Sequence, residues 1–183
     1  HSAAIPQAGK NLTFDISHRF KTTIEQAEEL KKKYGISKTA LATNEKIIIK
    51  GVKGRESIDI SQKDLAEVIE PRMIEILTKS LEQIKKSNVA HKLNFGVVIT
   101  GGGSQLKNLI DLSQEIFNMP VKIGFPEIID SEVSQYKNNP RYATAFGIVQ
   151  YASSCKVDDF TSSIDFNVVD KIKKLINKLT NWY

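Results

Sequence analysis

The chain has few of the residue types that build disulfides, metal sites or nucleic-acid surfaces. A single cysteine, Cys155, excludes an intramolecular disulfide and a multi-cysteine zinc site, which suits a reducing cytoplasm. The three histidines, at positions 1, 18 and 91, are too scattered to suggest a ligand cluster. Aromatic residues make up only 8% of the chain and the net charge is +5, with basic residues interleaved with glutamates, so there is no base-stacking platform and no basic stripe. We therefore predict no metal site and no nucleic-acid partner.

The chain is long enough to bury a sizeable core. Its 183 residues, 40% of them hydrophobic, suit one domain or two interlocked subdomains. The first residue is His1 rather than methionine, and no signal-peptide pattern follows it. We expect the chain to be a fragment of a longer protein.

Apolar spacing predicts helices that alternate with strands. Ser61 and Asp64 form a capping-box pattern that opens a long helix, which Pro71 is expected to kink or restart. Further helices are expected after residues 8–13 and over residues 23–34, 106–117 and 140–151, and strands over residues 45–50, 95–100 and 121–123. This order predicts an α/β fold with a mixed or parallel sheet.

A run of three glycines, Gly101, Gly102 and Gly103, is the most informative motif. It follows an apolar strand pattern and precedes Ser104 and an amphipathic segment. Glycine enters positive-φ regions freely and allows the backbone to approach a flat or anionic ligand, so a strand, a glycine turn and a helix together indicate a nucleotide site. A larger residue at Gly102 is expected to oppose the required φ and to fill the ligand volume. The alternative is a tight connection without a ligand.

Glu28 and Lys31 lie three residues apart on one face of an expected helix. There a carboxylate can accept from ribose hydroxyls and an ammonium group can lie against a purine. The alternative is an ordinary solvated helix pair. Two further segments frame these motifs: residues 8–13, which contain Gly9, precede one helix, and Pro140 stands at the first position of another.

The last residues form an amphipathic pattern. At about 100° per residue, one set of side chains falls within an arc of roughly 140°. That apolar set is Val168, Val169, Ile172, Leu175, Ile176, Leu179, Trp182 and Tyr183, and the opposite face carries Lys171, Lys173, Lys174 and Lys178. The segment is too short and too charged to span a bilayer, which favours a helix lying in the plane of an anionic membrane. The alternative is packing on the protein's own core or on a partner helix.

Taken in order, these motifs resemble the C-terminal half of the actin/Hsp70-like ATPases, and among them the FtsA family of bacterial cell-division proteins. The matching segments spread over most of the first 152 residues, and they are residues 5–15, 27–35, 67–72, 98–104, 120–124 and 140–145. The resemblance implies an actin-like (ribonuclease H-like) ATPase fold, a mixed sheet flanked by helices with an inserted smaller subdomain. It also implies that the phosphate loops, and with them most of the Mg²⁺ and triphosphate chemistry and any ATPase activity, lie upstream of this chain.

The resemblance also implies roles for particular residues. Gly101, Gly102 and Gly103 would pass under the adenine and ribose of ATP, and Ser104 would open the next helix. Glu28 would hold the ribose hydroxyls, Lys31 would flank the purine, and Gly9 would lie near the phosphates. These residues form the predicted ATP site, and no catalytic residue is assigned within the chain.

The same resemblance implies the domain organisation. Residues 1–22 and 87–152 would form the nucleotide-binding subdomain, and residues 23–86 the smaller subdomain that receives the C-terminal peptide of FtsZ. Because that peptide is acidic and apolar, Arg72 is the leading candidate to grip its carboxylates, the alternative being a solvated arginine. Residues 153–166, rich in serine, threonine and aspartate, would be a flexible linker to the membrane-targeting helix, residues 167–183.

Three classes of function remain open on sequence grounds. The favoured one is an ATP-binding scaffold that polymerises, joins other division proteins and anchors FtsZ to the cytoplasmic face of the inner membrane at the septum. The second is a small-molecule kinase of the same superfamily, which has no need of a lipid-binding tail. The third is another actin-like adaptor, such as a pilus-assembly platform or an MreB-like protein.

Overall fold

The first two elements are helices, and each begins directly after an N-cap residue. The computed structural model describes residues 1–51, 54, 56–87, 93, 95–127, 136 and 138–154. Helix α1 (Gly9–Phe20) begins after Ala8, whose N–H donates to the side chain of Asn11 at 2.9 Å. Helix α2 (Ile24–Tyr34) begins after Thr23, whose hydroxyl accepts a backbone N–H of the first turn. The helix predicted over 23–34 is therefore confirmed.

A hairpin leads directly into the longest helix. Strands β1 (Lys46–Ile49) and β2 (Ile58–Ser61) pair antiparallel, and α3 (Gln62–Lys86) follows β2 without a loop. The predicted capping box is confirmed: the Ser61 hydroxyl accepts the Asp64 N–H, and the Asp64 carboxylate accepts the Ser61 N–H. The short 3₁₀ helix η1 (Thr39–Leu41) lies between α2 and the hairpin and packs against α3.

The sequence predicted a kink or a restart at Pro71. Helix α3 continues through Pro71 without a restart, and the kink stays a prediction. Proline removes one intrahelical donor, which leaves the carbonyl of Glu67 without its usual partner. Both Pro71 and Glu67 are solvent-exposed. On the opposite face Ile69 and Met73 are buried and hold the helix against the core. Tertiary packing therefore keeps one helix where local propensity predicts a break.

A β–α–β unit carries the glycine turn. Strand β3 (Val97–Ile99) pairs in parallel with β4 (Val121–Ile123), and helix α4 (Leu109–Phe117) makes the crossover. Between β3 and α4 the chain forms the 3₁₀ helix η3 (Gly102–Gln105). The sequence predicted a helix from residue 106, but α4 begins three residues later. The residues before α4 instead contact the segment after α2, where Ile36 forms a parallel bridge with Lys107.

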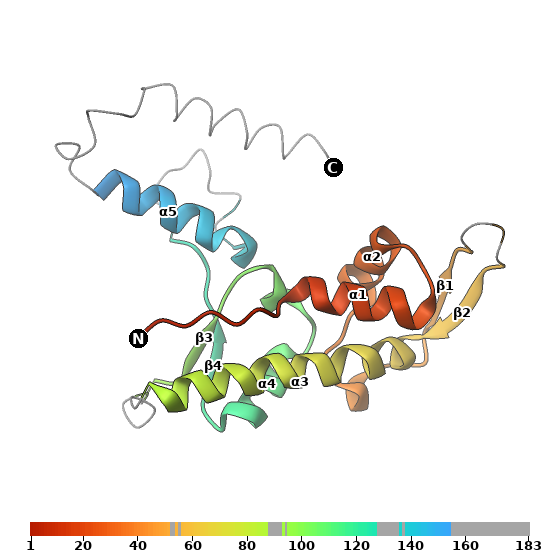
Figure 1. The fold of residues 1–183 in the computed structure, drawn as a ribbon, viewed down its shortest axis with the longest axis horizontal. Coiled ribbons are helices and arrows are strands. Elements are labelled where there is room, and N and C mark those ends of the chain that lie inside the picture. Colours follow the sequence, from red (N-terminus) through yellow and green to blue (C-terminus); the bar gives the residue numbers. More distant parts are fainter. Residues whose placement is uncertain are drawn as a thin grey trace. The chain divides into compact units, whose positions relative to one another are not determined.

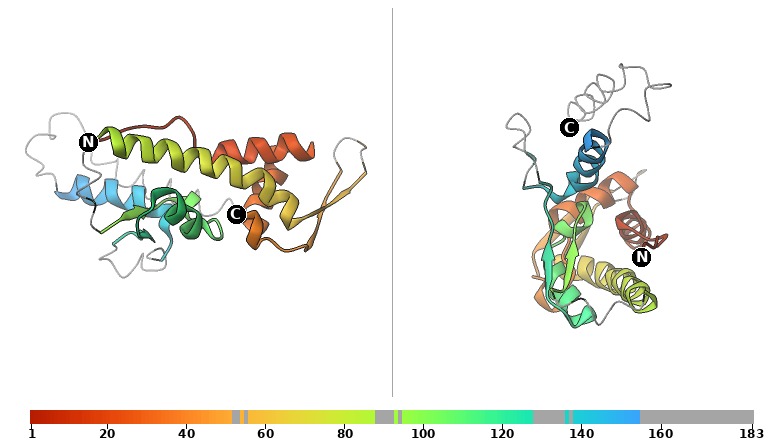
Figure 2. Two further views of the ribbon diagram at one scale, coloured as in Figure 1. Left: turned by 90° about the horizontal axis from the view of Figure 1, so that it is seen from below. Right: turned by 90° about the vertical axis from the view of Figure 1, so that its left-hand side faces the viewer.

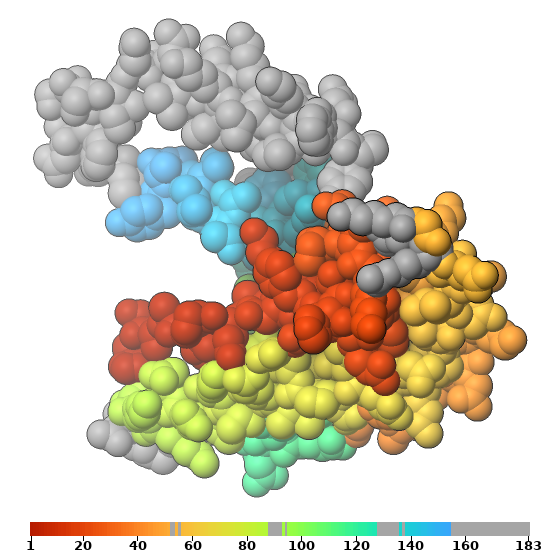
Figure 3. Space-filling model, turned by 45° about the vertical axis from the view of Figure 1, so that its right-hand side comes forward, coloured from red at the N-terminus to blue at the C-terminus, as the bar shows by residue number. Residues whose placement is uncertain are grey.

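One hydrophobic cluster runs through the elements up to β4. Its fully buried members include Ile16 of α1, Ala27 of α2, and Leu65 and Ile69 of α3. Helix α1 lies alongside both α2 and α3, and α3 also contacts α4 (Figures 1 and 2). In the space-filling view the surface of α1, in red, lies directly against that of α3, in yellow (Figure 3). Both predicted subdomains contribute to this cluster, and the division between them stays a prediction.

The chain divides into two compact units, residues 1–146 and 147–183. In the first unit, the 3₁₀ helix η5 (Pro140–Tyr142) packs against η3. Helix α5 (Ala143–Ser154) follows η5 and extends into the second unit. The predicted α/β class is confirmed: helices dominate the described residues, and the strands form two small sheets, one antiparallel and one parallel.

Candidate nucleotide site

The glycine run turns the chain at the carboxyl end of the parallel strands. Gly101 has a φ of 91°, in the left-handed region that favours glycine. Its N–H donates to the Pro140 carbonyl at 3.1 Å, and its own carbonyl accepts the Ser104 N–H at 3.1 Å and the Ser104 hydroxyl at 2.7 Å. The prediction that Gly102 has the required positive φ is wrong. Gly101 has it, because the chain reverses at the first glycine and Gly102 already lies in η3.

The faces of these glycines are open. A Cβ at Gly101 or Gly103 would meet no described atom within 4 Å, and one at Gly102 would meet Cγ of Arg141 at 3.7 Å, an ordinary contact. In α/β folds, ligands bind beyond the carboxyl ends of parallel strands. The turn therefore leaves room for a flat ligand against the backbone, which is what an adenine nucleotide requires.

Ser104 supports the turn rather than starting a helix of its own. It is 2% exposed, and its hydroxyl is used by the Gly101 carbonyl. The sequence predicted that Ser104 opens the following helix, but it lies inside η3. Leu106, at the end of η3, is extended and separates it from α4. The role of Ser104 in the structure is to hold Gly101 in place.

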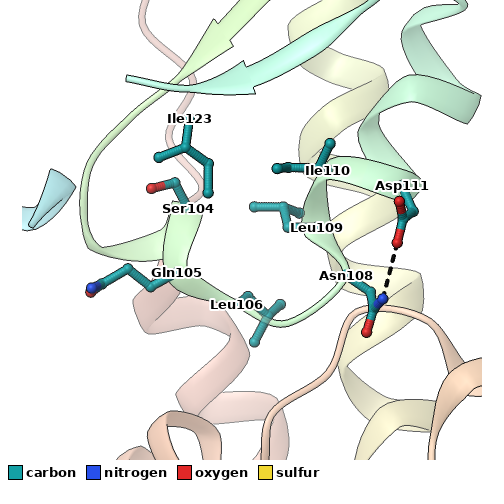
Figure 4. Close-up of a pocket in the computed structure, with 8 residues that line it drawn as sticks. All are labelled: Ser104, Gln105, Leu106, Asn108, Leu109, Ile110, Asp111 and Ile123. Atoms are coloured by element: carbon teal, nitrogen blue, oxygen red, sulfur yellow. Dashed lines mark hydrogen bonds between the residues drawn. The ribbon is translucent and has the colours of Figure 1, made fainter. Parts of the chain in front are cut away.

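A shallow cavity of about 310 Å³ lies beside the turn (Figure 4). It is lined by Ser104, Gln105, Leu106, Asn108, Leu109, Ile110, Asp111 and Ile123. On one side of it, the Asn108 amide donates a 2.9 Å hydrogen bond to the Asp111 carboxylate (Figure 4). Of the residues predicted to bind nucleotide, Ser104 alone lines this cavity. The open faces of the glycines are thus a separate feature from it.

Three predicted residues meet between α1 and α2. The Lys31 ammonium donates to the Gly9 carbonyl at 3.0 Å, to the Thr13 hydroxyl at 2.8 Å and to Oε2 of Glu28 at 2.6 Å. The Lys31 side chain is 15% exposed and that of Glu28 is 34% exposed. Glu28 and Lys31 do share one helix face, as their spacing predicts, and α1 supplies the other two contacts.

The Glu28 carboxyl is held in its charged form. Partial burial acts to raise its pKa, but hydrogen bonds from Lys31 and Thr13 and the charges of Lys31 and Lys32 outweigh burial and lower the pKa. Oε2 takes the contacts with Lys31 and Thr13, and Oε1 lies 3.7 Å from the Lys32 ammonium. A charged, partly exposed carboxylate oxygen is a suitable acceptor for hydroxyl groups.

The end of α2 contacts the segment that follows the glycine turn. A Cβ on Gly35 would lie 2.2 Å from the Lys31 carbonyl and 2.9 Å from Cδ1 of Leu106, so only glycine fits there. Beside it, the N–H and the hydroxyl of Ser37 both donate to the Lys107 carbonyl, at 3.0 Å and 2.8 Å. These contacts connect the helix that carries Glu28 and Lys31 to the chain emerging from η3.

Arg72 is engaged within the fold. Its Nε and one terminal nitrogen donate to the two carboxylate oxygens of Asp15, at 2.6 Å and 3.1 Å, and its other terminal nitrogen donates to Glu75 at 2.5 Å. The Arg72 side chain is 28% exposed. A guanidinium has five N–H groups, and these contacts use three of them. The group joins α1 to α3 and retains donors for a further acceptor.

The predicted membrane-binding residues lie outside the described residues. They are Lys171, Ile172, Lys174, Leu175, Ile176, Lys178, Leu179 and Trp182. Within the part of the chain that the structure describes, no helix is long and apolar enough to cross a membrane. Within that same part, no group of three or more histidine, cysteine or acidic side chains could hold a metal ion.

Two residues of the site were not assigned a role from the sequence. Thr13 lies one turn after Gly9 on α1, a spacing that signals a shared helix face but not the contact with α2. Gly35 directly follows α2, and a glycine there is an ordinary helix-end signal. Their roles depend on contacts between segments that sequence spacing alone does not bring together.

Comparison with known proteins first defines the class of fold. The structure of MreB5 of Spiroplasma citri bound to ADP matches with a TM-score of 0.62 and 17% identity, over 87% of this chain and 48% of that one. The fold is therefore actin-like. The model of the family described as "Cell division protein FtsA" matches residues 1–147. The chain belongs to the FtsA family of cell division proteins, which confirms the resemblance found in the sequence.

Relatives within the family span most of this chain. The cell division protein FtsA of Pseudomonas aeruginosa is 33% identical over 165 residues, covering 90% of this chain and 39% of that protein. The FtsA of Buchnera aphidicola subsp. Baizongia pistaciae is 34% identical over 193 residues, covering 100% of this chain and 45% of that protein. The chain thus spans less than half the length of these relatives.

Proposed function

We propose that the protein containing this chain binds ATP as part of an actin-like cell-division scaffold. The observation that carries the proposal is the glycine turn, whose three open faces lie at the carboxyl end of the parallel strands. The charged Glu28 on α2 supports it, because its helix ends against the segment that follows the turn. The ADP named for the MreB5 structure is further support at the level of the fold.

In this proposal each residue has a stated role. The adenine and ribose lie against Gly101, Gly102 and Gly103, and Glu28 accepts the ribose hydroxyls. Lys31 flanks the purine with its aliphatic stem, since its three N–H groups already have acceptors. Gly9 lies toward the phosphates. The triphosphate and Mg²⁺ are held mainly by residues outside this chain.

The scaffold function extends the proposal to partners. The protein polymerises through actin-like contacts, binds the acidic C-terminal peptide of FtsZ with the help of Arg72, and joins other division proteins at the septum. The segment 167–183 attaches it to anionic lipids on the cytoplasmic face of the inner membrane. Family membership and the charge of Arg72 support the FtsZ contact, and the amphipathic pattern of residues 167–183 supports the membrane contact.

Enlarging Gly103 tests the nucleotide site. Because a Cβ at this position meets no described atom within 4 Å and Gly103 has no positive φ, Gly103→Leu should leave the fold intact. Its side chain would occupy the space assigned to the nucleotide, so ATP affinity should fall by roughly tenfold or more. Gly103→Ala, with one added carbon, should have a smaller effect.

The measurement is equilibrium titration of the full-length protein with ATP, alongside thermal unfolding. Unchanged ATP affinity in Gly103→Leu would mean that the glycine run is only a turn. The small-molecule kinase is the second candidate, and it predicts no co-sedimentation with anionic liposomes. Liposome binding by the full-length protein therefore separates the kinase from the scaffold.

A further inference from the structure

Thr13 connects the two residues assigned to ribose and purine. The residue is 3% exposed, and its hydroxyl contacts both α1 and α2. The hydroxyl oxygen accepts from the Lys31 ammonium at 2.8 Å, and the hydroxyl hydrogen has two acceptors in reach, Oε2 of Glu28 at 2.5 Å and the Gly9 carbonyl at 3.2 Å. A hydroxyl has one hydrogen, and the shorter, charged contact with Glu28 takes it.

The three contacts of Lys31 form a closed arrangement with Thr13. The ammonium has three N–H groups, and its acceptors are Gly9, Thr13 and Glu28. Lys31 therefore has no N–H left to donate to a ligand. Its role is to hold the Glu28 carboxylate in place. Removing the Thr13 hydroxyl would leave one Lys31 N–H without its partner in a poorly hydrated place, and would free Oε2 of Glu28 on one side.

We propose that Thr13 is a positioning residue for nucleotide recognition, whose hydroxyl fixes the Glu28 carboxylate so that Oε1 accepts the ribose hydroxyls of an adenine ribonucleotide. The inference rests on the proposed function. Oε2 is held by Thr13 and Lys31, which sets the rotation of the carboxylate and leaves Oε1 toward Lys32 at the more exposed side. A fixed acceptor loses less freedom when it binds a hydroxyl than a rotating one does.

The test compares two nucleotides in the full-length protein. ATP and 2′,3′-dideoxy-ATP differ in the ribose hydroxyls alone, so the ratio of their dissociation constants reports the ribose contact. Thr13→Val keeps the shape of the side chain and removes the hydroxyl. We expect Thr13→Val to weaken ATP binding by roughly tenfold or more and dideoxy-ATP binding much less. The dissociation constant of dideoxy-ATP divided by that of ATP should therefore fall toward one. Thr13→Ser retains the hydroxyl and should keep the ratio of the unaltered protein.

A control for the loss of any buried hydroxyl is Ser113→Ala on α4. Ser113 is 0% exposed, and its hydroxyl donates to the Leu109 carbonyl of the same helix at 2.6 Å. This variant should lower thermal stability and leave the nucleotide ratio unchanged. If Thr13→Val instead lowers stability and weakens both nucleotides equally, Thr13 is structural and the inference is wrong.

Glu28→Gln separates failure of the inference from failure of the proposed function. If Glu28→Gln reduces the ATP preference while Thr13→Val keeps it, the ribose site stands and the positioning role of Thr13 is overturned. If the unaltered protein binds ATP and dideoxy-ATP equally well, the ribose assignment of Glu28 fails and the role of Thr13 fails with it.

Discussion

At the scale of single residues, Arg72 is a side chain that joins two helices of the fold and is also the proposed contact for the FtsZ peptide. It pairs with both carboxylate oxygens of Asp15 and with Glu75, and these contacts raise its pKa, chiefly through the hydrogen bonds to Asp15. The proposed carboxylates of the FtsZ peptide would have to share the guanidinium with these two acids. Any substitution of Arg72 therefore acts on stability as well as on binding.

We predict that Arg72→Glu weakens binding of the FtsZ C-terminal peptide by about 2 kcal/mol or more, because attraction across the surface becomes repulsion. The same change places three carboxylates together and should cost roughly 1 kcal/mol of folding stability. Peptide titration and thermal unfolding of the full-length protein measure the two effects. The double variant with Asp15→Arg restores an opposite-charge pair at the α1–α3 contact. If peptide binding returns with it, Arg72 acts through the fold and not by touching the peptide.

Glu75 makes the stability of the α3 surface depend on pH. Hydrogen bonds from Lys79 and then from Gln7, with the charges of Lys79 and Arg72, lower its pKa from 4.5 to about 2 against the opposing effect of burial. Because the folded-state pKa is the lower one, Glu75 stabilises the fold above pH 4.5, and this contribution is lost as the pH falls toward about 2. We predict that the stability gap between the unaltered protein and Glu75→Gln narrows over this range in urea unfolding. A gap that is constant with pH would contradict the role of the Glu75 charge.

At the scale of elements, the sequence predicted best where local signals act alone. The strand over residues 45–50, the capping box of Ser61 and the helix over residues 23–34 all depend on alternation, on a cap or on periodicity within a few residues. The predicted boundaries differ from the structure where contacts between distant segments determine where a helix continues or begins. Helix α3 passes through Pro71 because its buried face is held by the core, and α4 begins late because Leu106 and Lys107 contact the segment after α2.

In the candidate site too, features set by nearby residues could be predicted, and features set by contacts between helices could not. The shared helix face of Glu28 and Lys31 could be predicted from their spacing, and the glycine turn from its composition. The contribution of Thr13 could not, because it arises from the packing of α1 on α2. Nor could the position of the one positive φ within the run, since any of the three glycines can adopt it.

Loss of the terminal segment should remove membrane binding and leave the other proposed functions unchanged. We predict that deleting residues 168–183, or placing glutamate at Leu175 and Trp182, releases the full-length protein from anionic liposomes without changing ATP affinity. Each apolar side chain at the interface contributes up to roughly 1.5 kcal/mol and each lysine about 1 kcal/mol, so losing two central apolar groups should detach a single amphipathic segment. Co-sedimentation measures it, and higher salt should give partial release by screening the lysines. A truncated protein that stays bound, or that unfolds, would show that the segment does not act as the anchor.

At the scale of the whole molecule, the order of the motifs identified the family where no single motif could. A glycine turn, a Glu–Lys helix pair and a proline-led helix are each common, but their succession along the chain matches the FtsA family over residues 1–147. The chain spans 39% of the Pseudomonas aeruginosa relative and 45% of the Buchnera aphidicola relative. Binding of ATP, of the FtsZ peptide and of lipid is therefore to be measured on the full-length protein.

The contacts between α1 and α2 also differ from those of Arg72 in the length of chain that they close. Lys31 reaches back 22 positions to Gly9, whereas Arg72 reaches back 57 positions to Asp15 and Glu75 reaches back 68 to Gln7. Because the entropy cost of closing a loop rises with its length, the cluster of Gly9, Thr13, Glu28 and Lys31 closes its loops at a lower entropy cost. This half of the candidate site therefore comes from one uninterrupted stretch that ends at α2, and during synthesis all of its residues are present before the hairpin or α3 has been made.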